Sequence, residues 1–442
     1  MGYGNGVTIG VTKQCPTCGS ELPVDVGFVT WCGGCGWNLR PPDPPRASGR
    51  LDRLYERAGR RMGERMAARL LAADTLEPKL TPAKAAAYVI AGLVHLLTLG
   101  FLLLGVALIV LGFPNVFALV FGAISIGMAI LLRPRLGKAP DEGVLSRSDA
   151  PTLYGVADEV AASLGIQGID MLVVDHEFNA SWSVVGIRRR RVMSLGLPLL
   201  QALSPQERIA LIAHELAHAR NGDARRGFFV GSAVNALAEL YWIVAPEDLP
   251  TEALGGFGIL ERAANGFFYV FSRPLWWLLL LELHLLLRDA QRAEYLADAL
   301  AARAAGTDAV VALSEKILLE PTFRAVVQHA ARPGMNEDLF ETLRTTVERI
   351  PDRERERRRR AARLEAAELI ATHPPTAKRI ALLEGRPRVK PAVPLTDERS
   401  AAIDEELAAR RRALQEQLVD DHRHRLYQSD GYFVVSGGDD YF

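Results

Sequence analysis

The sequence predicts an α+β protein that is mostly helical and is embedded in a membrane. Three observations lead to this fold class. They are long apolar runs that could cross a bilayer, a helical segment with two histidines on one face, and two cysteine pairs near the N-terminus. Strand-like runs are short and lie within residues 171–195. The 442 residues carry a formal net charge of zero, so composition gives no reason to expect a nucleic-acid partner.

The four cysteines form two Cys-x-x-Cys pairs, each followed by a glycine that can take backbone angles other residues resist. Four thiolates at this spacing predict a zinc ribbon at residues 13–40 with a closed, structural site. Its ligands would be Cys15, Cys18, Cys32 and Cys35. Two disulfides are the alternative, but the spacing on a cytoplasmic segment favours zinc. The simplest role is to stabilise a domain too small for a core of its own.

Residues 41–84 form a linker and a basic amphipathic helix. The stretch 40–45 is rich in proline and predicts a stiff connection. Residues 51–73 then predict a helix with an apolar stripe of Leu51, Tyr55, Met62, Met66 and Leu70. Its other faces carry Arg53, Arg57, Arg60, Arg61, Arg65 and Arg69. Such a helix beside a membrane segment could lie on anionic lipid. Packing against the protein is the alternative.

Residues 85–133 predict two transmembrane helices, Ala85–Phe113 and Val116–Leu132, because each is nearly continuous in apolar residues. The turn between them is uncharged. The outer flanks carry Arg65, Arg69, Lys79 and Lys84 before the pair, and Arg133, Arg135 and Lys138 after it. The positive-inside rule therefore places both flanks, and the N-terminus, in the cytoplasm.

A second apolar pair, residues 228–245 and 266–287, is interrupted by polar side chains. These are Asn235 and Glu239 in the first segment and Arg273, Glu282 and His284 in the second. We expect two further spans, about four in all, whose polar faces turn toward the protein interior. Re-entrant or interfacial helices are the alternative.

The segment from Ser204 to Arg220 predicts a helix with defined ends. Ser204 is a natural N-cap, Pro205 suits the first helical position, and Glu207 completes a capping box. Gly222 can adopt the left-handed conformation that stops the helix.

This helix contains the motif His-Glu-x-x-His. Residues four apart share a helix face, so His214 and His218 could hold one zinc ion. Glu215 would then lie beside the metal, where it could take a proton from a water molecule. The alternative is a helix with two partly exposed histidines and an unrelated glutamate.

A carboxylate pair follows the last apolar segment. Glu294 and Asp298 share a helix face, which suits a zinc ligand and a partner for the ring N–H of a ligating histidine. Glu282 and His284 are rival ligands, but they lie in an apolar run at membrane depth. Glu294 lies beyond that run, at the expected cytoplasmic boundary. We therefore predict Glu294 as the third ligand.

Residues 150–164 predict a helix, and residues 171–174, 179–185 and 191–195 predict strands. A basic turn, 188–190, joins the last two. An extended peptide could bind by adding a strand to such an edge, which would hold its backbone across the metal. A plain hairpin that covers the site helix is the alternative.

In the order of these parts the chain resembles the HtpX-like membrane zinc metallopeptidases, relatives of the CAAX prenyl endopeptidases. The resemblance runs from about Ala85 to Leu383. It rests on two spans, an Asn-Ala edge strand, His-Glu-x-x-His with Asn-Gly-Asp, two more apolar segments and Glu-x-x-x-Asp. A late His-Pro-Pro…Arg motif at 372–380 also matches. The resemblance implies a zincin-type metallopeptidase domain at residues 145–385, with the ribbon as an addition outside the family pattern.

The resemblance also implies a role for each site residue. His214, His218 and Glu294 would bind the catalytic zinc, Glu215 would be the base, and Asp298 would orient a ligand. His373 and Arg379 would lie near the site and could steady the oxyanion. Asn179 and Ala180 would belong to the substrate strand. With the ribbon, this makes one catalytic and one structural zinc. Such a set is typical of an HExxH…E gluzincin.

We therefore expect a membrane-bound zinc metalloendopeptidase with a cytoplasmic active site, acting on protein or peptide substrates. The family implies membrane-protein quality control. The alternatives are a processing protease for lipid-modified peptides and a non-catalytic membrane adaptor that uses the ribbon. A decayed site would be expected to lose at least one of His214, Glu215, His218 and Glu294, and all four are present.

The last part of the chain is rich in charge. The run Arg353–Arg363 predicts a solvated helix face, with lipid headgroups as a second contact. Residues 386–442 predict a separate region, made of a charged helix at 396–418 and an acidic, aromatic tail at 427–442.

Overall fold

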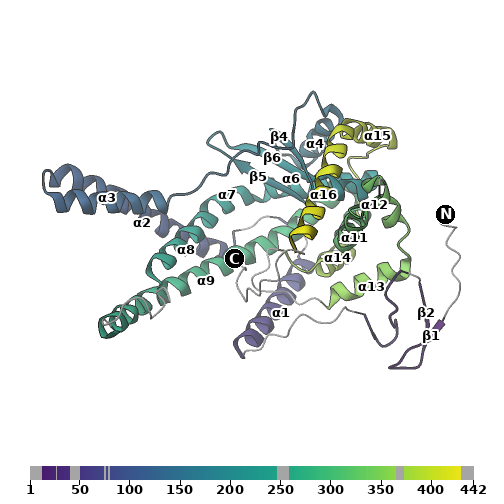
Figure 1. Ribbon diagram of the computed structural model, residues 1–442, viewed down its shortest axis with the longest axis horizontal. Coiled ribbons are helices and arrows are strands. Elements are labelled where there is room, and N and C mark those ends of the chain that lie inside the picture. Colours follow the sequence, from purple (N-terminus) through teal and green to yellow (C-terminus); the bar gives the residue numbers. More distant parts are fainter. Residues whose placement is uncertain are drawn as a thin grey trace.

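The computed structural model describes residues 12–25, 27–39, 50–73, 76–77, 80–245, 258–335, 337–364 and 373–429. Figure 1 shows a helical body that carries a small sheet, with pairs of apolar helices projecting from it. This arrangement confirms the predicted α+β, mostly helical class. The predicted linker at 40–45, the loop at 247–256 and the tail from residue 430 lie outside the described residues.

The apolar segments form two helix pairs. The first pair is α2 (Pro82–Gly112) with α3 (Val116–Leu131). The second is the helical stretch α7 (Asp223–Arg226), η1 (Gly227–Gly231) and α8 (Ser232–Val244), with α9 (Gly258–Ala305). Three helices are long and apolar enough to cross a membrane, namely α2, the stretch 223–244 and the part of α9 from residue 268. With 16 residues, α3 is shorter, so the count of about four spans stays a prediction.

An ion-pair cluster joins the helix pairs where their apolar parts meet the body. Asp289 on α9 accepts contacts from Lys84 on α2 at 3.3 Å and from Arg226 on α7 at 3.0 Å. Beyond this cluster α2 exposes large apolar side chains, such as Leu93 and Leu96, each more than 60% exposed. A contiguous apolar surface of this kind is expected where lipid is the solvent.

The sheet has the strand order β3-β4-β6-β5. Its strands are β3 (Val144–Leu145), β4 (Met171–Asp175), β5 (Ala180–Val185) and β6 (Arg190–Gly196). Strands β4 and β6 are parallel, and β5 pairs antiparallel with β6 through a tight turn in which Gly186 and Arg189 take positive φ. Among the described strands, β5 has a neighbour on one side alone, which confirms the predicted edge strand.

One core fixes the sheet against the site helix. Leu172 and Met193 from the sheet pack with Ile209 and Ile212 of α6 (Pro205–Asn221) and with α4 (Pro151–Leu164). The last turns of α9 enter the same core through Ala297. Burial of one such Leu or Ile side chain stabilises the fold by roughly 1.5–3 kcal/mol. The two helices that carry the predicted metal ligands are therefore held rigidly together.

The C-terminal region belongs to this core as well. The single helix predicted at 396–418 is wrong: the chain forms α15 (Asp397–Glu406) and α16 (Ala408–Ser429), which meet at Leu407. Leu407 is fully buried, and Ile403 and Leu414 pack beside it in the core. Asp404 also pairs with Arg208 of α6 at 2.8 Å. The boundary predicted after residue 385 therefore falls inside a shared core.

The basic helix α1 (Arg50–Leu71) packs against the protein over its C-terminal half. Met66 and Leu70 contact an apolar cluster formed by Tyr295 and Leu296 of α9 and Leu382 of α14 (Thr376–Glu384). The side chains of the first part of the predicted stripe, Leu51 and Tyr55, lie outside the described residues. For the described half, packing on the protein is the correct alternative.

Candidate active site and cysteine ribbon

The site helix α6 has the ends that its sequence predicts. The Ser204 N–H donates to Glu207 Oε2 at 2.7 Å, which forms one half of a complete capping box, and Pro205 occupies the first turn. Gly222 closes the helix with φ of 76°. The regular helix between them places His214 and His218 one turn apart, with ring centroids 5.0 Å from each other.

Three side chains converge as a possible metal-binding group: His214, His218 and Glu294. The Nε2 atom of His214 lies 3.5 Å from Glu294 Oε2, and Nε2 of His218 lies 3.6 Å from Glu294 Oε1. Ligands about 2.0–2.2 Å from a tetrahedral ion lie roughly 3.3–3.6 Å from one another, so the spacing fits. Glu294 Oε2 is buried and forms an ion pair with Arg379, but it accepts no hydrogen bond from the described residues. These observations fit a zinc site.

The Nδ1 atom of each histidine lies within hydrogen-bond distance of a carboxylate oxygen. His214 Nδ1 lies 3.1 Å from Asp298 Oδ1, and His218 Nδ1 lies 2.6 Å from Asp223 Oδ2. A carboxylate that accepts the Nδ1–H leaves the Nε2 lone pair free and fixes the ring plane, as is usual for metal-binding histidines. The role predicted for Asp298, to orient a ligating histidine, stays a prediction that this contact makes possible.

The role of Asp223 was missed by the sequence reasoning, which gave this residue no function beyond its place in the Asn-Gly-Asp motif. It lies at the start of α7, and Arg226 holds its other oxygen at 3.0 Å. Asn221 donates to the Ala293 carbonyl at 3.1 Å and ties the end of α6 to α9. The signal that could have identified Asp223 is an acid directly after a glycine stop, one turn beyond a predicted histidine ligand.

Two residues from the late motif lie against the same carboxylates. The buried Arg379 on α14 donates to both oxygens of Asp298, from Nε at 2.8 Å and from Nη2 at 2.6 Å. Its Nη1 lies 3.2 Å from Glu294 Oε2. His373 is 63% exposed, and its Nδ1 lies 3.0 Å from Glu294 Oε1. The contacts of Arg379 are those of a group that positions the two carboxylates.

The charges around the site favour a cation between the donors. Burial alone would lower the pKa of His214, but the neighbouring Asp298 and Glu294 raise it to about 10. The pKa of Arg379 is raised, because the same two carboxylates outweigh its burial. The negative charges of Asp298 and Glu294, which stabilise a proton on His214, would also stabilise a divalent cation bound between the donors.

The donor group lines a cleft of about 870 Å³. Glu215 also lines this cleft, although it is outside the three-residue donor group. Asn179 and the strand β5, from Ala180 onward, form one wall, and His373 lies on another side. The free edge of β5 thus borders the cleft, where an extended peptide could pair with it.

The rival ligands lie elsewhere on α9. Glu282 is fully buried, and neither of its carboxylate oxygens has a hydrogen-bond partner among the described residues. Neither Glu282 nor His284 belongs to the donor group or to the cleft. The carboxylate that lies with the two helix histidines is that of Glu294, and its role as a metal ligand stays a prediction.

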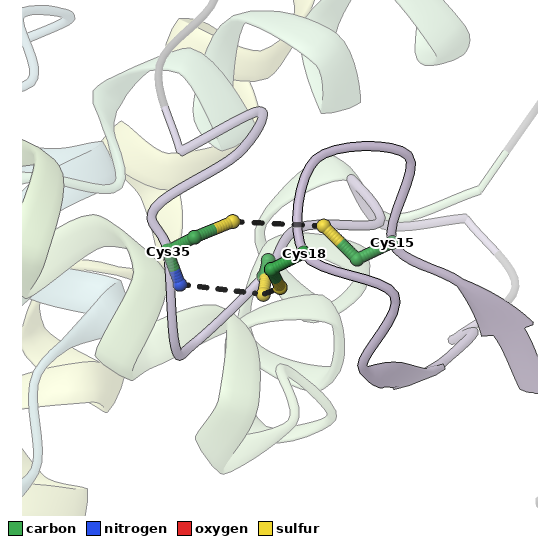
Figure 2. A group of neighbouring side chains, drawn as sticks. Cys15, Cys18 and Cys35 are labelled. Atoms are coloured by element: carbon green, nitrogen blue, oxygen red, sulfur yellow. Dashed lines mark hydrogen bonds between the residues drawn. The ribbon is translucent and has the colours of Figure 1, made fainter.

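The cysteine ribbon, residues 12–39 with residue 26 outside the description, contains a second group that could hold a metal. Figure 2 shows the sulfurs of Cys15, Cys18 and Cys35 directed toward one another from two loops. Cys15 Sγ lies 3.6 Å from Cys35 Sγ, and Cys18 Sγ lies 3.6 Å from Cys32 Sγ. These separations exceed the roughly 2.05 Å of a disulfide but fit thiolates about 2.3 Å from one tetrahedral ion.

The ribbon docks on the arginine-rich helix α13 (Asp352–Arg363). Arg353 and Arg360 hold their guanidinium groups 5.1 and 5.3 Å from the ring centroid of the buried Trp31. Arg357 donates to the Leu39 carbonyl at 2.9 Å and pairs with the buried Glu354. The prediction of a solvated face is therefore wrong for this helix, because its arginines bind ribbon carbonyls and an aromatic ring.

The comparisons with known proteins agree with this geometry. No curated protein and no solved structure matches the chain. The model of peptidase family M48 matches residues 148–387, which include the site helix, the cleft wall β5, Glu294 and Arg379. Because this match covers more than half of the 442 residues, the chain belongs to peptidase family M48, a family of metallopeptidases.

Proposed function

We propose that this chain is an integral-membrane zinc endopeptidase that cleaves membrane-associated proteins on the cytoplasmic side, in membrane-protein quality control. One observation carries the proposal. The donor group His214, His218 and Glu294 lies beside Glu215 in a cleft bordered by a free strand edge. Together these supply a metal site, a base and a place for an extended peptide.

His214, His218 and Glu294 would hold the ion. Zinc bound by three such ligands keeps a fourth position open, polarises a carbonyl and lowers the pKa of water to about 7. Glu215 would take the proton of the attacking water and deliver it to the leaving amine nitrogen. Asp298 and Asp223 would accept hydrogen bonds from the Nδ1–H groups of the two imidazoles. The proton would then stay on Nδ1, and Nε2 would be free to bind the ion.

The remaining groups would bind the substrate. The free edge of β5, beginning at Asn179 and Ala180, would pair with the peptide backbone along the cleft. His373, whose ring is exposed at the cleft, would donate to the carbonyl oxygen as negative charge develops on it. Arg379 is fully engaged by Asp298 and Glu294, so we assign it to positioning these carboxylates rather than to the oxyanion.

The position of the site suits substrates at the membrane surface. Helix α9 runs without a break from its apolar part through Asp289 to Glu294. Five residues of helix span about 7.5 Å, so the donor group would lie just beyond the end of the apolar segment. By the positive-inside rule, the arginines and lysines near the end of the apolar segment support a cytoplasmic position for the site.

Substrate trapping tests the proposal most directly. Membranes would contain either Glu215→Gln or, as the matched control, the double variant Glu215→Gln with His218→Ala, which also lacks a ligand. Proteins that purify with the first variant and not with the second would be identified by mass spectrometry. Membrane proteins with cytoplasmic segments are expected. A set of lipid-modified soluble peptides would favour the processing role, and an identical set from both variants would favour the adaptor.

Cysteine labelling tests the orientation. Single cysteines placed at residues 113–115 and at 249–256 should react with a membrane-impermeant reagent from outside the cell. Cysteines near Arg188 or Arg379 should react only after the membrane is opened. Labelling of 249–256 from the cytoplasm alone would make the second helix pair interfacial and would refute the proposed spans.

A further inference from the structure

A second large cavity lies away from the active site, between α1 and the bases of α2 and α9. Its volume is about 860 Å³, within the range of pockets that bind small molecules. Five arginines line it: Arg61, Arg65, Arg69, Arg288 and Arg292. Only two acidic residues, Glu77 and Asp289, share the lining. The cavity is therefore strongly basic.

The arginines that line the cavity come from two helices. Arg61, Arg65 and Arg69 follow one another at intervals of four on α1, and Arg288 and Arg292 do so on α9, so each set shares one helix face. Asp289 is already bound by Lys84 and Arg226. Within the described parts of the chain, none of the five arginines forms an ion pair with a carboxylate, and Arg292 Nε is buried without a hydrogen-bond partner. Like charges converging in this way call for an anion.

Part of the cavity lining is apolar, and the cavity lies beside the first residues of the apolar helix α2. Met62, Met66 and Leu70 line it beside the arginines. Thr81, Pro82 and Ala83, the residues at which the apolar helix α2 begins, also line it. The lining therefore changes from cationic to apolar at the point where the proposed spans enter the membrane.

We propose that this cavity binds the headgroup phosphate of an anionic phospholipid, with the acyl chains lying along the apolar surfaces of α2 and α9. Basic pockets at the cytoplasmic ends of membrane helices suit such headgroups, because arginines bind phosphate oxygens in pairs while the chains stay in the bilayer. The lipid would link α1 to the helix bases. The inference rests on the proposed membrane insertion of α2 and α9, but not on peptidase activity.

Native mass spectrometry of the purified full chain in detergent tests the site. The protein would be titrated with phosphatidylglycerol, with phosphatidylcholine of the same acyl chains, and with inorganic phosphate. The cavity variant is Arg65→Gln/Arg69→Gln/Arg292→Gln. The matched control is Arg324→Gln/Arg344→Gln/Arg388→Gln, which removes the same charge from exposed surface ion pairs. A third variant, with lysine in place of glutamine at the cavity positions, keeps the charge.

Each arginine near an anionic headgroup contributes about a fivefold factor in affinity, so the cavity variant should bind phosphatidylglycerol about a hundredfold more weakly. The control variant should bind it as the wild type does, and the lysine variant should retain most of the affinity. Should the glutamine variant lose its metals, Arg65→Gln alone, at an exposed position, is expected to show about a fivefold loss.

Three results would overturn the proposal. One is equal binding of phosphatidylglycerol and phosphatidylcholine by the wild type. Another is an equal loss in the cavity and control variants, which would indicate a general charge effect. The third is displacement of the lipid by inorganic phosphate at a similar concentration, which would identify a site for soluble phosphate. Failure of membrane insertion would be recognised separately by cysteine labelling.

Discussion

The two metal-binding groups of this chain differ in the number of donors and in what surrounds them. The cysteine ribbon offers four thiolates, of which Cys15 and Cys32 are buried. It contacts the body through the arginines of α13 and through Phe28, which packs against the main core. The His214 group offers three donors inside a cleft, with a carboxylate behind each histidine. A closed set of four ligands stabilises a small fold, whereas an open set of three beside a base can support a reaction.

The largest expected effect comes from the third ligand. Glu294→Ala should remove the metal of the cleft and abolish proteolysis, because two histidines on one helix leave the ion with too few donors. Elemental analysis should show one zinc left of two, held by the ribbon. His284→Ala is the control on the same helix and should keep both. Two zincs retained in Glu294→Ala would overturn the ligand assignment.

The next effect separates the base from the ligands. Glu215→Gln should keep both zincs and the fold, since no donor is lost, while the rate of casein cleavage should fall about 10²- to 10⁴-fold without a proton acceptor. The measurements are metal content and the rate of peptide release by purified protein. Cleavage at the wild-type rate would exclude Glu215 as the base.

A smaller effect is expected at the two carboxylates behind the histidines. Asp298→Asn and Asp223→Asn should each weaken zinc binding in the cleft about 10- to 100-fold, since an amide orients the imidazole less well. Competition with a chelator would measure this. Asp308→Asn, at an exposed ion pair, is a suitable control. A loss at Asp298 without any at Asp223 would show that the contact to His218 has no role in metal binding.

The smallest effect on activity should come from the ribbon. Cys15→Ser with Cys18→Ser should remove one zinc and make residues 12–39 sensitive to proteolysis, because a closed thiolate site contributes folding free energy. The peptidase rate should stay within about twofold, since none of the ribbon's described residues lines the cleft. A folded variant without activity would instead make the ribbon a control element.

Some features of the site were readable in advance because they depend on near neighbours in the chain. The capping box of Ser204 and Glu207 fixes where the site helix begins, and the four-residue spacing puts His214 and His218 on one face. Glu294 could be chosen over Glu282 because the apolar run ends between them. The Cys-x-x-Cys spacing likewise predicted the ribbon.

Other features depend on segments far apart in the sequence. Helix α13 has the composition of a solvated helix, but its arginines contact distant segments. Arg357 binds the ribbon, more than 300 residues earlier, and Arg358 donates to the Leu318 carbonyl. The break at Leu407 reflects a core that gathers α15 and α16 against α6. Neither result can be predicted from the neighbouring residues, because the helix propensity of an arginine or a leucine does not depend on what its side chain contacts.

The sequence by itself determined the apolar helices, the site helix with its two histidines, and the four-cysteine ribbon, since hydrophobic length, helical periodicity and ligand spacing are local properties. The tertiary structure decided which carboxylates support the histidines, that Arg379 binds Asp298 and Glu294, and that β5 borders the cleft. These pairings form only when the core brings α6, α9, α14 and the sheet together. Their cause is the three-dimensional path of the chain, which residue spacing does not encode.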